Sequence, residues 1–125
     1  MLKKMLPLAL LAALLTGCNA TFTNLTPTQQ VRNADGLYPV EVSLNTRQAT
    51  IRWDTIEPKV LVGTNYIAMR PTLLMKNRWE GFVPVPPGTN IVYYRYRFDF
   101  DYNDFGGPKR DNALSPEYRL RILDE

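Results

Sequence analysis

The chain has 125 residues and a formal net charge of +3, and this length allows one domain with a single modest core. It contains no histidine and only one cysteine, which excludes Ser-His and Cys-His catalysis and nearly every zinc site. Lys3 and Lys4 lie in a segment expected to be removed, so the mature chain is close to neutral and offers no concentrated basic face for nucleic acid.

The first seventeen residues have the pattern of a cleavable export signal. Lys3 and Lys4 supply its positive start, and the run from Leu6 to Leu15 is almost entirely Leu and Ala. This run is too short to span a bilayer comfortably as a mature helix, whereas it suits the apolar region of a signal peptide. Residues 1–17 are therefore predicted to form a helical signal peptide.

The four residues Leu15-Thr16-Gly17-Cys18 resemble the lipobox of bacterial lipoproteins. The resemblance implies that signal peptidase II cuts between Gly17 and Cys18, that Cys18 receives a diacylglyceryl thioether, and that the new amino group is open to acylation. The alternative is an ordinary secretory signal with an incidental cysteine. Cys18 is the only cysteine, so an intrachain disulfide is excluded and the covalent lipid is the only cofactor expected. Asn19 follows it where Asp would signal inner-membrane retention, which favours the periplasmic side of the outer membrane.

The segment 19–36 is rich in Asn, Thr and Gln and shows no sustained period of 2 or 3.6. We expect residues 18–36 to form the lipidated start of the mature chain and a flexible tether. Fully extended, such a tether would reach about 55 to 60 Å and would hold the domain clear of its membrane. The alternative is that part of this segment forms a first edge strand.

From Tyr38 onward, apolar and polar residues alternate as they do in half-buried strands. In the first strand the residues expected to point inward are Tyr38, Val40, Val42 and Leu44. The same pattern recurs over 49–53, and 45–48 is predicted to be the hairpin connection between the two strands. Further short strands are expected over 59–63, 66–70 and 79–85, before a turn at Pro86-Pro87-Gly88.

The strongest alternation predicts one long strand over 91–103. Its inner face would carry Val92, Tyr94, Tyr96, Phe98, Phe100 and Tyr102. Most of this aromatic stripe is expected to be core, because stacked sheets need alternating apolar residues between them. The alternative is a binding platform, for which the ring at the end of the stripe, Tyr102, is the best candidate.

The last strand is predicted over 118–123, with Arg119 and Arg121 pointing outward. If it lies antiparallel to the long strand, these arginines would face Asp99 and Asp101 across the sheet. The intervening residues 104–116 are expected to form a long loop, and such loops on β-sandwiches often carry function.

About seven short strands, ten prolines, seven glycines and no amphipathic helix after the signal predict an all-β fold. We expect an immunoglobulin-like β-sandwich over 37–125. The missing cysteine pair excludes an antibody-type domain.

Carboxylates are the remaining candidates for chemistry. Asp99-x-Asp101-x-Asn103 imitates the start of a calcium loop, but Asp104 stands where glycine is needed and Arg110 where glutamate is needed. Alternation along the strand explains these acids better, so no metal site is expected. The spacing does not exclude a carboxylate pair for sugar hydrolysis, yet no cleft-forming architecture is evident and no catalytic residue is expected.

The stretch Met75–Tyr102 resembles the strand, Pro-Gly turn and aromatic strand of early-set immunoglobulin-like domains, the group that includes glycogen-binding modules. Val85-Pro86-Pro87-Gly88 matches the turn, and residues 96–101 match the strand after it. The resemblance implies an early-set fold and a sugar-contacting role for Arg97, with further candidate ligand contacts at Tyr66, Trp79 and Tyr102. Trp79 also begins an alternating strand, so its alternative place is in the core. The whole mature chain resembles short lipoproteins of environmental bacteria, which implies no activity.

The expected function is that of a membrane-anchored, non-catalytic envelope lipoprotein whose sandwich acts as an interaction or structural module. Its partner would be another envelope protein, bound through a sheet edge or through residues 104–116. The alternative is a carbohydrate-binding module for glycan or peptidoglycan, which would use the aromatic and arginine contacts named above. A third hypothesis, a small hydrolase, requires two acidic side chains that converge in a cleft.

Overall fold

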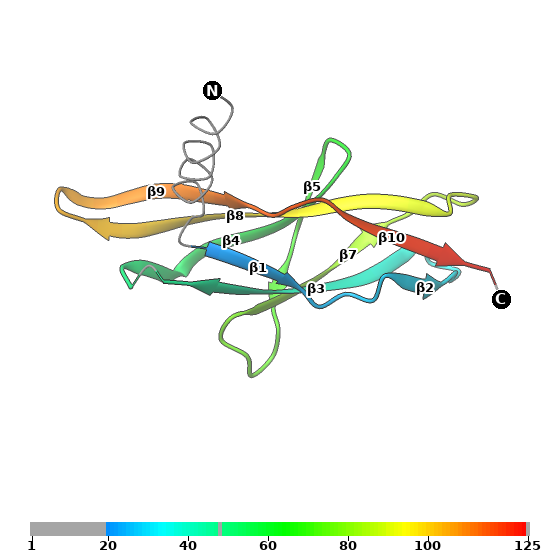
Figure 1. Cartoon of the computed structure of the whole chain (residues 1–125), viewed down its shortest axis with the longest axis horizontal. Coiled ribbons are helices and arrows are strands. Elements are labelled where there is room, and N and C mark those ends of the chain that lie inside the picture. Colours follow the sequence, from blue (N-terminus) through cyan, green and yellow to red (C-terminus); the bar gives the residue numbers. More distant parts are fainter. Residues whose placement is uncertain (1–19, 48, 125) are drawn as a thin grey trace, which may run out of the picture.

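A computed structural model describes residues 20–47 and 49–124 (Figure 1). These residues form ten strands: β1 (Ala20–Asn24), β2 (Gln29–Val31), β3 (Leu37–Thr46), β4 (Ile51–Val62), β5 (Asn65–Ala68), β6 (Arg70–Pro71), β7 (Arg78–Pro84), β8 (Ile91–Asp104), β9 (Gly107–Leu114) and β10 (Tyr118–Leu123). One sheet has the order β1-β3-β7-β6. The other has the order β2-β10-β8-β4-β5, with β9 also paired to β8. The predicted all-β sandwich is confirmed, with ten strands in place of about seven.

The predicted signal peptide and the lipidation residue Cys18 lie outside the described residues. Within 20–47 and 49–124, no helix is long and apolar enough to cross a membrane.

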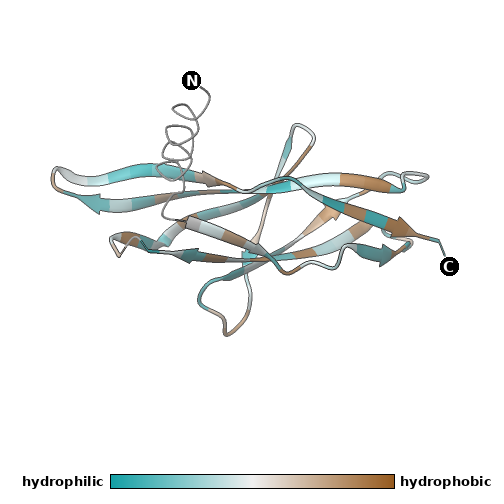
Figure 2. Ribbon diagram, viewed as in Figure 1, coloured by the Kyte–Doolittle hydropathy of each residue, from teal (hydrophilic) through white to brown (hydrophobic). Residues whose placement is uncertain are grey.

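A single hydrophobic core lies between the two sheets, and hydrophobic and hydrophilic bands alternate along the strands that enclose it (Figure 2). The inward residues of β3 are buried as predicted: Tyr38, Val40, Val42 and Leu44. On β8 the buried residues are Tyr94, Tyr96, Phe98 and Phe100, which confirms that most of the aromatic stripe is core. Each apolar Å² removed from water contributes about 25 cal/mol, so the burial of these two stripes helps to hold the sheets together.

The segment 104–116, expected to be a long loop, forms a hairpin with β8. Strand β9 pairs antiparallel with β8 from Arg97↔Leu114 to Asp104↔Gly107, and only residues 105 and 106 form the turn. The prediction was wrong because almost every residue of β9 is exposed, so the strand carries no alternating apolar signature.

Strands β9 and β10 follow one another along the same edge of β8. Ser115 lies at the change from one to the other, where its N–H donates to the Tyr96 carbonyl at 2.9 Å. The Tyr96 N–H in turn donates to Ser115 Oγ at 2.8 Å. The serine hydroxyl therefore replaces a ladder hydrogen bond at this point of the sheet.

Strand β4 unites the two short strands expected over 49–53 and 59–63. Its pairing with β8 shifts between Arg52 and Glu57, so residues 53–56 bulge out of the ladder. Thr55 holds the bulge, because its hydroxyl donates to the Arg52 carbonyl at 2.6 Å and accepts from the Asp101 N–H at 2.8 Å. The hairpin expected at 45–48 is also corrected, since β3 and β4 belong to different sheets and the connection crosses between them.

The flexible tether expected over 18–36 is replaced, from Ala20 onward, by edge strands, as the alternative interpretation proposed. Strand β1 pairs antiparallel with β3, with Ala20 opposite Thr46, and β2 pairs parallel with β10. Both strands are short and mostly polar, so the sequence shows no alternation that would predict them. Backbone hydrogen bonds to β3 and β10 hold them in place. In β1, Phe22 packs edge-on against Phe98, with 5.1 Å between ring centroids.

The predicted antiparallel pairing of the last strand with β8 is confirmed, but its register differs from the expectation. Arg119 lies opposite Tyr93 and Arg121 opposite Ile91, so neither arginine faces Asp99 or Asp101. Asp101 instead pairs with Arg110 of β9, with 3.0 Å between Arg110 Nη1 and Asp101 Oδ1. Strand β9 occupies the edge beside these acids, which leaves β10 only the first residues of β8.

Candidate functional site

Trp79, one of the predicted ligand contacts, belongs to the core. Its side chain is only 5% exposed and packs edge-on against Phe98, with 4.9 Å between ring centroids. The indole of Trp53 stacks on it nearly parallel, at 6.3 Å and 2°. Trp79 therefore has no free face for a ligand, in agreement with its alternative place in the core.

Tyr66 and Arg97 come together on the outer face of the larger sheet. The guanidinium carbon of Arg97 lies 5.8 Å from the centroid of the Tyr66 ring, within cation–π range. Asp99 Oδ1 accepts from Arg97 Nη2 at 3.3 Å, and Lys59 Nζ lies 3.9 Å from the other carboxylate oxygen. The interactions with Tyr66 and then with Asp99 raise the pKa of Arg97. The pair combines a charged and an aromatic side chain, and it lies on the outer face of the sheet.

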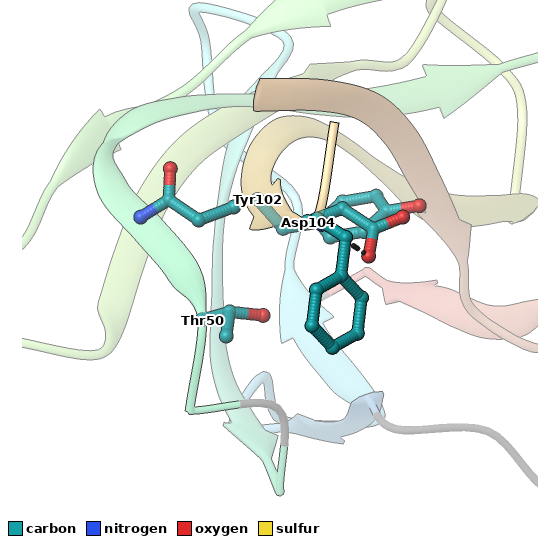
Figure 3. A pocket seen from close by; sticks show the side chains of 5 residues that line it. Thr50, Tyr102 and Asp104 are labelled. Carbon is teal, nitrogen blue, oxygen red and sulfur yellow. Dashed lines mark hydrogen bonds between the residues drawn. The ribbon is translucent and has the colours of Figure 1, made fainter. Parts of the chain in front are cut away.

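Tyr102 lies apart from that pair. It is five residues beyond Arg97 on β8, about 16 Å along the strand, and the odd spacing directs the two side chains to opposite faces. With Thr50, Asn103, Asp104 and Phe105 it lines a pocket of about 430 Å³ at the end of the sandwich (Figure 3). The four candidate ligand contacts are thus distributed over three places and do not form one site.

The acid in this pocket is not suited to proton transfer. The Phe105 N–H donates to Asp104 Oδ1 at 2.8 Å, and Lys109 Nζ lies 3.1 Å from Oδ2. The hydrogen bond from Phe105 and the contact with Lys109 lower the pKa of Asp104, so the carboxylate stays ionised at neutral pH. In the part of the chain that the structure describes, no group of three or more Cys, Asp or Glu residues is placed to hold a metal ion.

A more conspicuous feature, which the sequence analysis did not identify, is the loop 72–77 between β6 and β7. It is closed by a hydrogen bond from the Thr72 N–H to the Arg78 carbonyl, 2.9 Å long. Its tip exposes 84% of Leu73 and 95% of Leu74, and Met75 beside them is also exposed. The uninterrupted apolar run Leu73-Leu74-Met75 after Pro71 was the signal that could have indicated this loop.

The backbone of this loop is unfavourable for the residues that form it. Leu74 has φ +65°, and among the described residues it is the only one other than glycine with a positive φ. A leucine in this conformation costs roughly 1 to 2 kcal/mol. Thr72 Oγ1 is buried without a hydrogen-bond partner among the described residues. Folding alone therefore does not explain the sequence of the loop.

A cavity of about 690 Å³ adjoins the loop. It is lined by Leu44, Asn45, Thr46, Trp53, Lys76 and Asn77. Trp53 is 43% exposed here, and its inner face rests on Trp79. The cavity lies beside the start of β1, because Thr46, which lines it, is the residue opposite Ala20. We call Trp53, Leu73, Leu74, Met75 and Lys76 the basal patch.

Lys76 belongs to the basal patch, and Arg47 follows Thr46, which lines the adjoining cavity. Within the described residues, Lys76 and Arg47 form no ion pair, whereas Arg78 lies 3.8 Å from Glu41 and Arg70 lies 3.0 Å from Glu80. Apolar tips beside free cations are suited to contact with an apolar or anionic surface rather than to acid–base chemistry.

No protein-family model matches the chain, and no curated protein matches it.

Proposed function

We propose that this chain is a non-catalytic lipoprotein of the bacterial cell envelope, anchored through lipid on Cys18, whose β-sandwich acts as an interaction module. The observation that carries the proposal is that β1 begins at Ala20, two residues after the cysteine of the lipobox. Because consecutive Cα atoms are 3.8 Å apart, Cys18 is at most about 7.6 Å from the first residue of the sandwich. Fold and anchor are therefore adjacent in the chain.

The anchor is tested by expressing the full chain and its Cys18→Ser variant with a radioactive or clickable fatty acid. We expect the natural chain to incorporate the label and to sediment with membranes, and the variant to do neither. Thr21→Ser, three residues beyond the cysteine and outside the lipobox, is the matched control and should behave like the natural chain. Separation of inner from outer membranes should place the labelled protein in the outer membrane, as Asn19 favours. Absence of label on the natural chain would refute the proposal.

The partner in this proposal is another envelope protein, and the open edge of β9 is the surface we assign to it. Within the described residues β9 pairs only with β8, so its other edge has no strand beside it. Pro108 and the charged residues 109–111 discourage indiscriminate strand pairing. A photo-crosslinking residue at Asn112 should therefore yield a discrete adduct in intact cells, while one at Thr64, in the turn after β4, should not.

A carbohydrate-binding module is the second candidate function, and the exposed Tyr66–Arg97 pair favours it. An aromatic ring beside a guanidinium is suited to stacking on a sugar and donating to its hydroxyls. If it is correct, retention of the protein on insoluble glucan or peptidoglycan should fall in Tyr66→Ala and in Arg97→Ala. Tyr93→Ala provides the control, because Tyr93 is 52% exposed and Tyr66 is 51% exposed.

A further inference from the structure

We propose that the basal patch inserts into the same bilayer that holds the lipid of Cys18, so that the sandwich lies against the membrane. This inference rests on the proposed lipoprotein anchor. It adds a second contact, made by the folded domain, and it assigns a lipid surface as the ligand of the loop 72–77.

The loop 72–77 is in an unfavourable state when water surrounds it. Leu73 and Leu74 are almost wholly in water, Leu74 has a backbone conformation that disfavours leucine, and Thr72 Oγ1 has no partner among the described residues. Glycine or asparagine would be more favourable at position 74 if folding were the only requirement. Apolar side chains held in this way gain free energy only when another apolar phase covers them.

Strand β1 begins next to the cavity that adjoins the basal patch. Ala20 lies opposite Thr46, and Thr46 lines the same cavity as Trp53, Lys76 and Asn77. Asn77 is joined to β3 directly, since its carbonyl accepts from the Leu44 N–H at 3.0 Å. The described chain therefore begins in the neighbourhood of the basal patch. A lipid on Cys18 would hold the bilayer within a short covalent reach of it.

The side chains of the basal patch are suited to a lipid surface. Leucine and methionine side chains suit the acyl region, and a half-exposed tryptophan suits the interface between acyl chains and headgroups. The cations of Arg47 and Lys76, which lack ion pairs among the described residues, can contact lipid phosphates or anionic headgroups. Three apolar residues alone would bind a bilayer weakly. The anchor removes that difficulty because it keeps the loop at the surface.

The test uses the full chain, produced in bacteria, reconstituted into vesicles of phosphatidylethanolamine and phosphatidylglycerol. Cys18 is the only cysteine and its thiol would be blocked by lipid, so Leu74→Cys can be labelled alone with a polarity-sensitive fluorophore. Thr64→Cys is the control, because the β4–β5 turn and the loop 72–77 project from opposite sides of the sandwich (Figure 1). We expect blue-shifted emission at position 74 that is quenched by nitroxide-labelled lipid, and emission as in water at position 64.

The outcomes separate the two proposals. If the natural chain takes up the fluorophore at Cys18, the lipid anchor is refuted, and the insertion with it. If Cys18 is blocked and the protein is bound to vesicles but position 74 behaves like position 64, the insertion is refuted and the anchor stands. If position 74 is shielded in native envelopes but not in pure lipid vesicles, a protein covers the loop and the insertion is likewise refuted.

Discussion

Leu74 shows how one residue can work against the stability of its own fold. Its φ of +65° strains a branched side chain that is 95% exposed and so gains almost nothing from burial. We predict that Leu74→Gly raises the free energy of unfolding by about 1 kcal/mol, because glycine adopts this conformation without the steric penalty. Urea unfolding of the two full chains measures the difference. Leu73→Gly, at a position without a positive φ, should be neutral or destabilising, and a stabilisation of the same size there would contradict the explanation.

The hydroxyl of the buried Tyr96 lies in a network of hydrogen bonds. It donates to Asn24 Oδ1 at 2.7 Å and lies 3.2 Å from Thr26 Oγ1. Asn24 also donates to the Tyr94 hydroxyl at 2.8 Å, so the network ties the end of β1 to β8. Burial of the hydroxyl raises the pKa of Tyr96 far above its ordinary value. The folded state therefore holds the phenol proton more tightly than the unfolded state does.

This difference predicts unfolding at alkaline pH. Below about pH 10 the tyrosine is protonated in both states and contributes no pH dependence. Above that pH the unfolded chain releases the proton while the folded chain keeps it, so the stability falls as the pH rises. We expect the urea midpoint to decline above about pH 10, and to decline less steeply in Tyr96→Phe. That variant should also lose about 1 kcal/mol at neutral pH through its missing hydrogen bonds. Tyr93→Phe, at an exposed tyrosine, should leave both properties unchanged.

Two of the four candidate ligand residues are neighbours in the structure, and the other two lie elsewhere. Tyr66 and Arg97 do meet, but Trp79 is in the core and Tyr102 is at the far end of β8 on the other face. Periodicity tells which face of a strand a residue occupies, whereas the neighbours of that residue depend on strand pairing. The Trp53–Trp79 stack crosses from β4 to β7, and no local pattern could indicate it.

At the scale of elements, the predictable strands were those with one buried face. Strands β3, β8 and β10 alternate clearly, because the sandwich needs one apolar side from each. Strand β9 is exposed on both faces, and β1 and β2 are short polar edges, so their hydrogen bonds and not their side chains define them. The register of the strands could not be predicted from the sequence either. The place of β10 on β8 depends on how much of that edge β9 already occupies.

Ser115 offers a test of the arrangement in which β9 and β10 share one edge of β8, because it lies between these two strands. Its hydroxyl accepts from the buried Tyr96 N–H and also donates to the Pro116 carbonyl at 2.8 Å. We predict that Ser115→Ala lowers the free energy of unfolding by about 1 to 3 kcal/mol, since it leaves a buried backbone donor without a partner. Hydrogen exchange should show faster exchange of the Tyr96 amide than in the natural chain. Asn112→Ala, on the exposed face of β9, should change neither measurement, and an unaffected Tyr96 amide in Ser115→Ala would contradict the assigned role.

At the scale of the whole molecule, the proposed lipid anchor would make the short connection between Cys18 and Ala20 decide how the sandwich faces the membrane. The β8–β9 turn and the C-terminal end of the described chain lie at opposite ends of the long axis (Figure 1). A domain joined to the proposed anchor through Asn19 alone would have little freedom to exchange one end for the other at the surface. Under the proposed anchor this connection would therefore constrain the sandwich, whereas the composition of residues 18–36 predicted a long spacer.

Lengthening this connection separates the effect of the anchor from the effect of the loop. A flexible Gly/Ser insertion of roughly 20 residues between Asn19 and Ala20 would span about 25 Å, against about 7.6 Å across the natural two-residue step. The height available to the domain grows about threefold and its rotation is freed, so the basal patch should meet the bilayer less often. We predict that the insertion leaves fatty-acid labelling of Cys18 unchanged while the fluorophore at position 74 loses much of its quenching by nitroxide lipid. A rigid insertion of equal length should reduce quenching further, and undiminished quenching in both would mean that the loop binds lipid without help from the anchor.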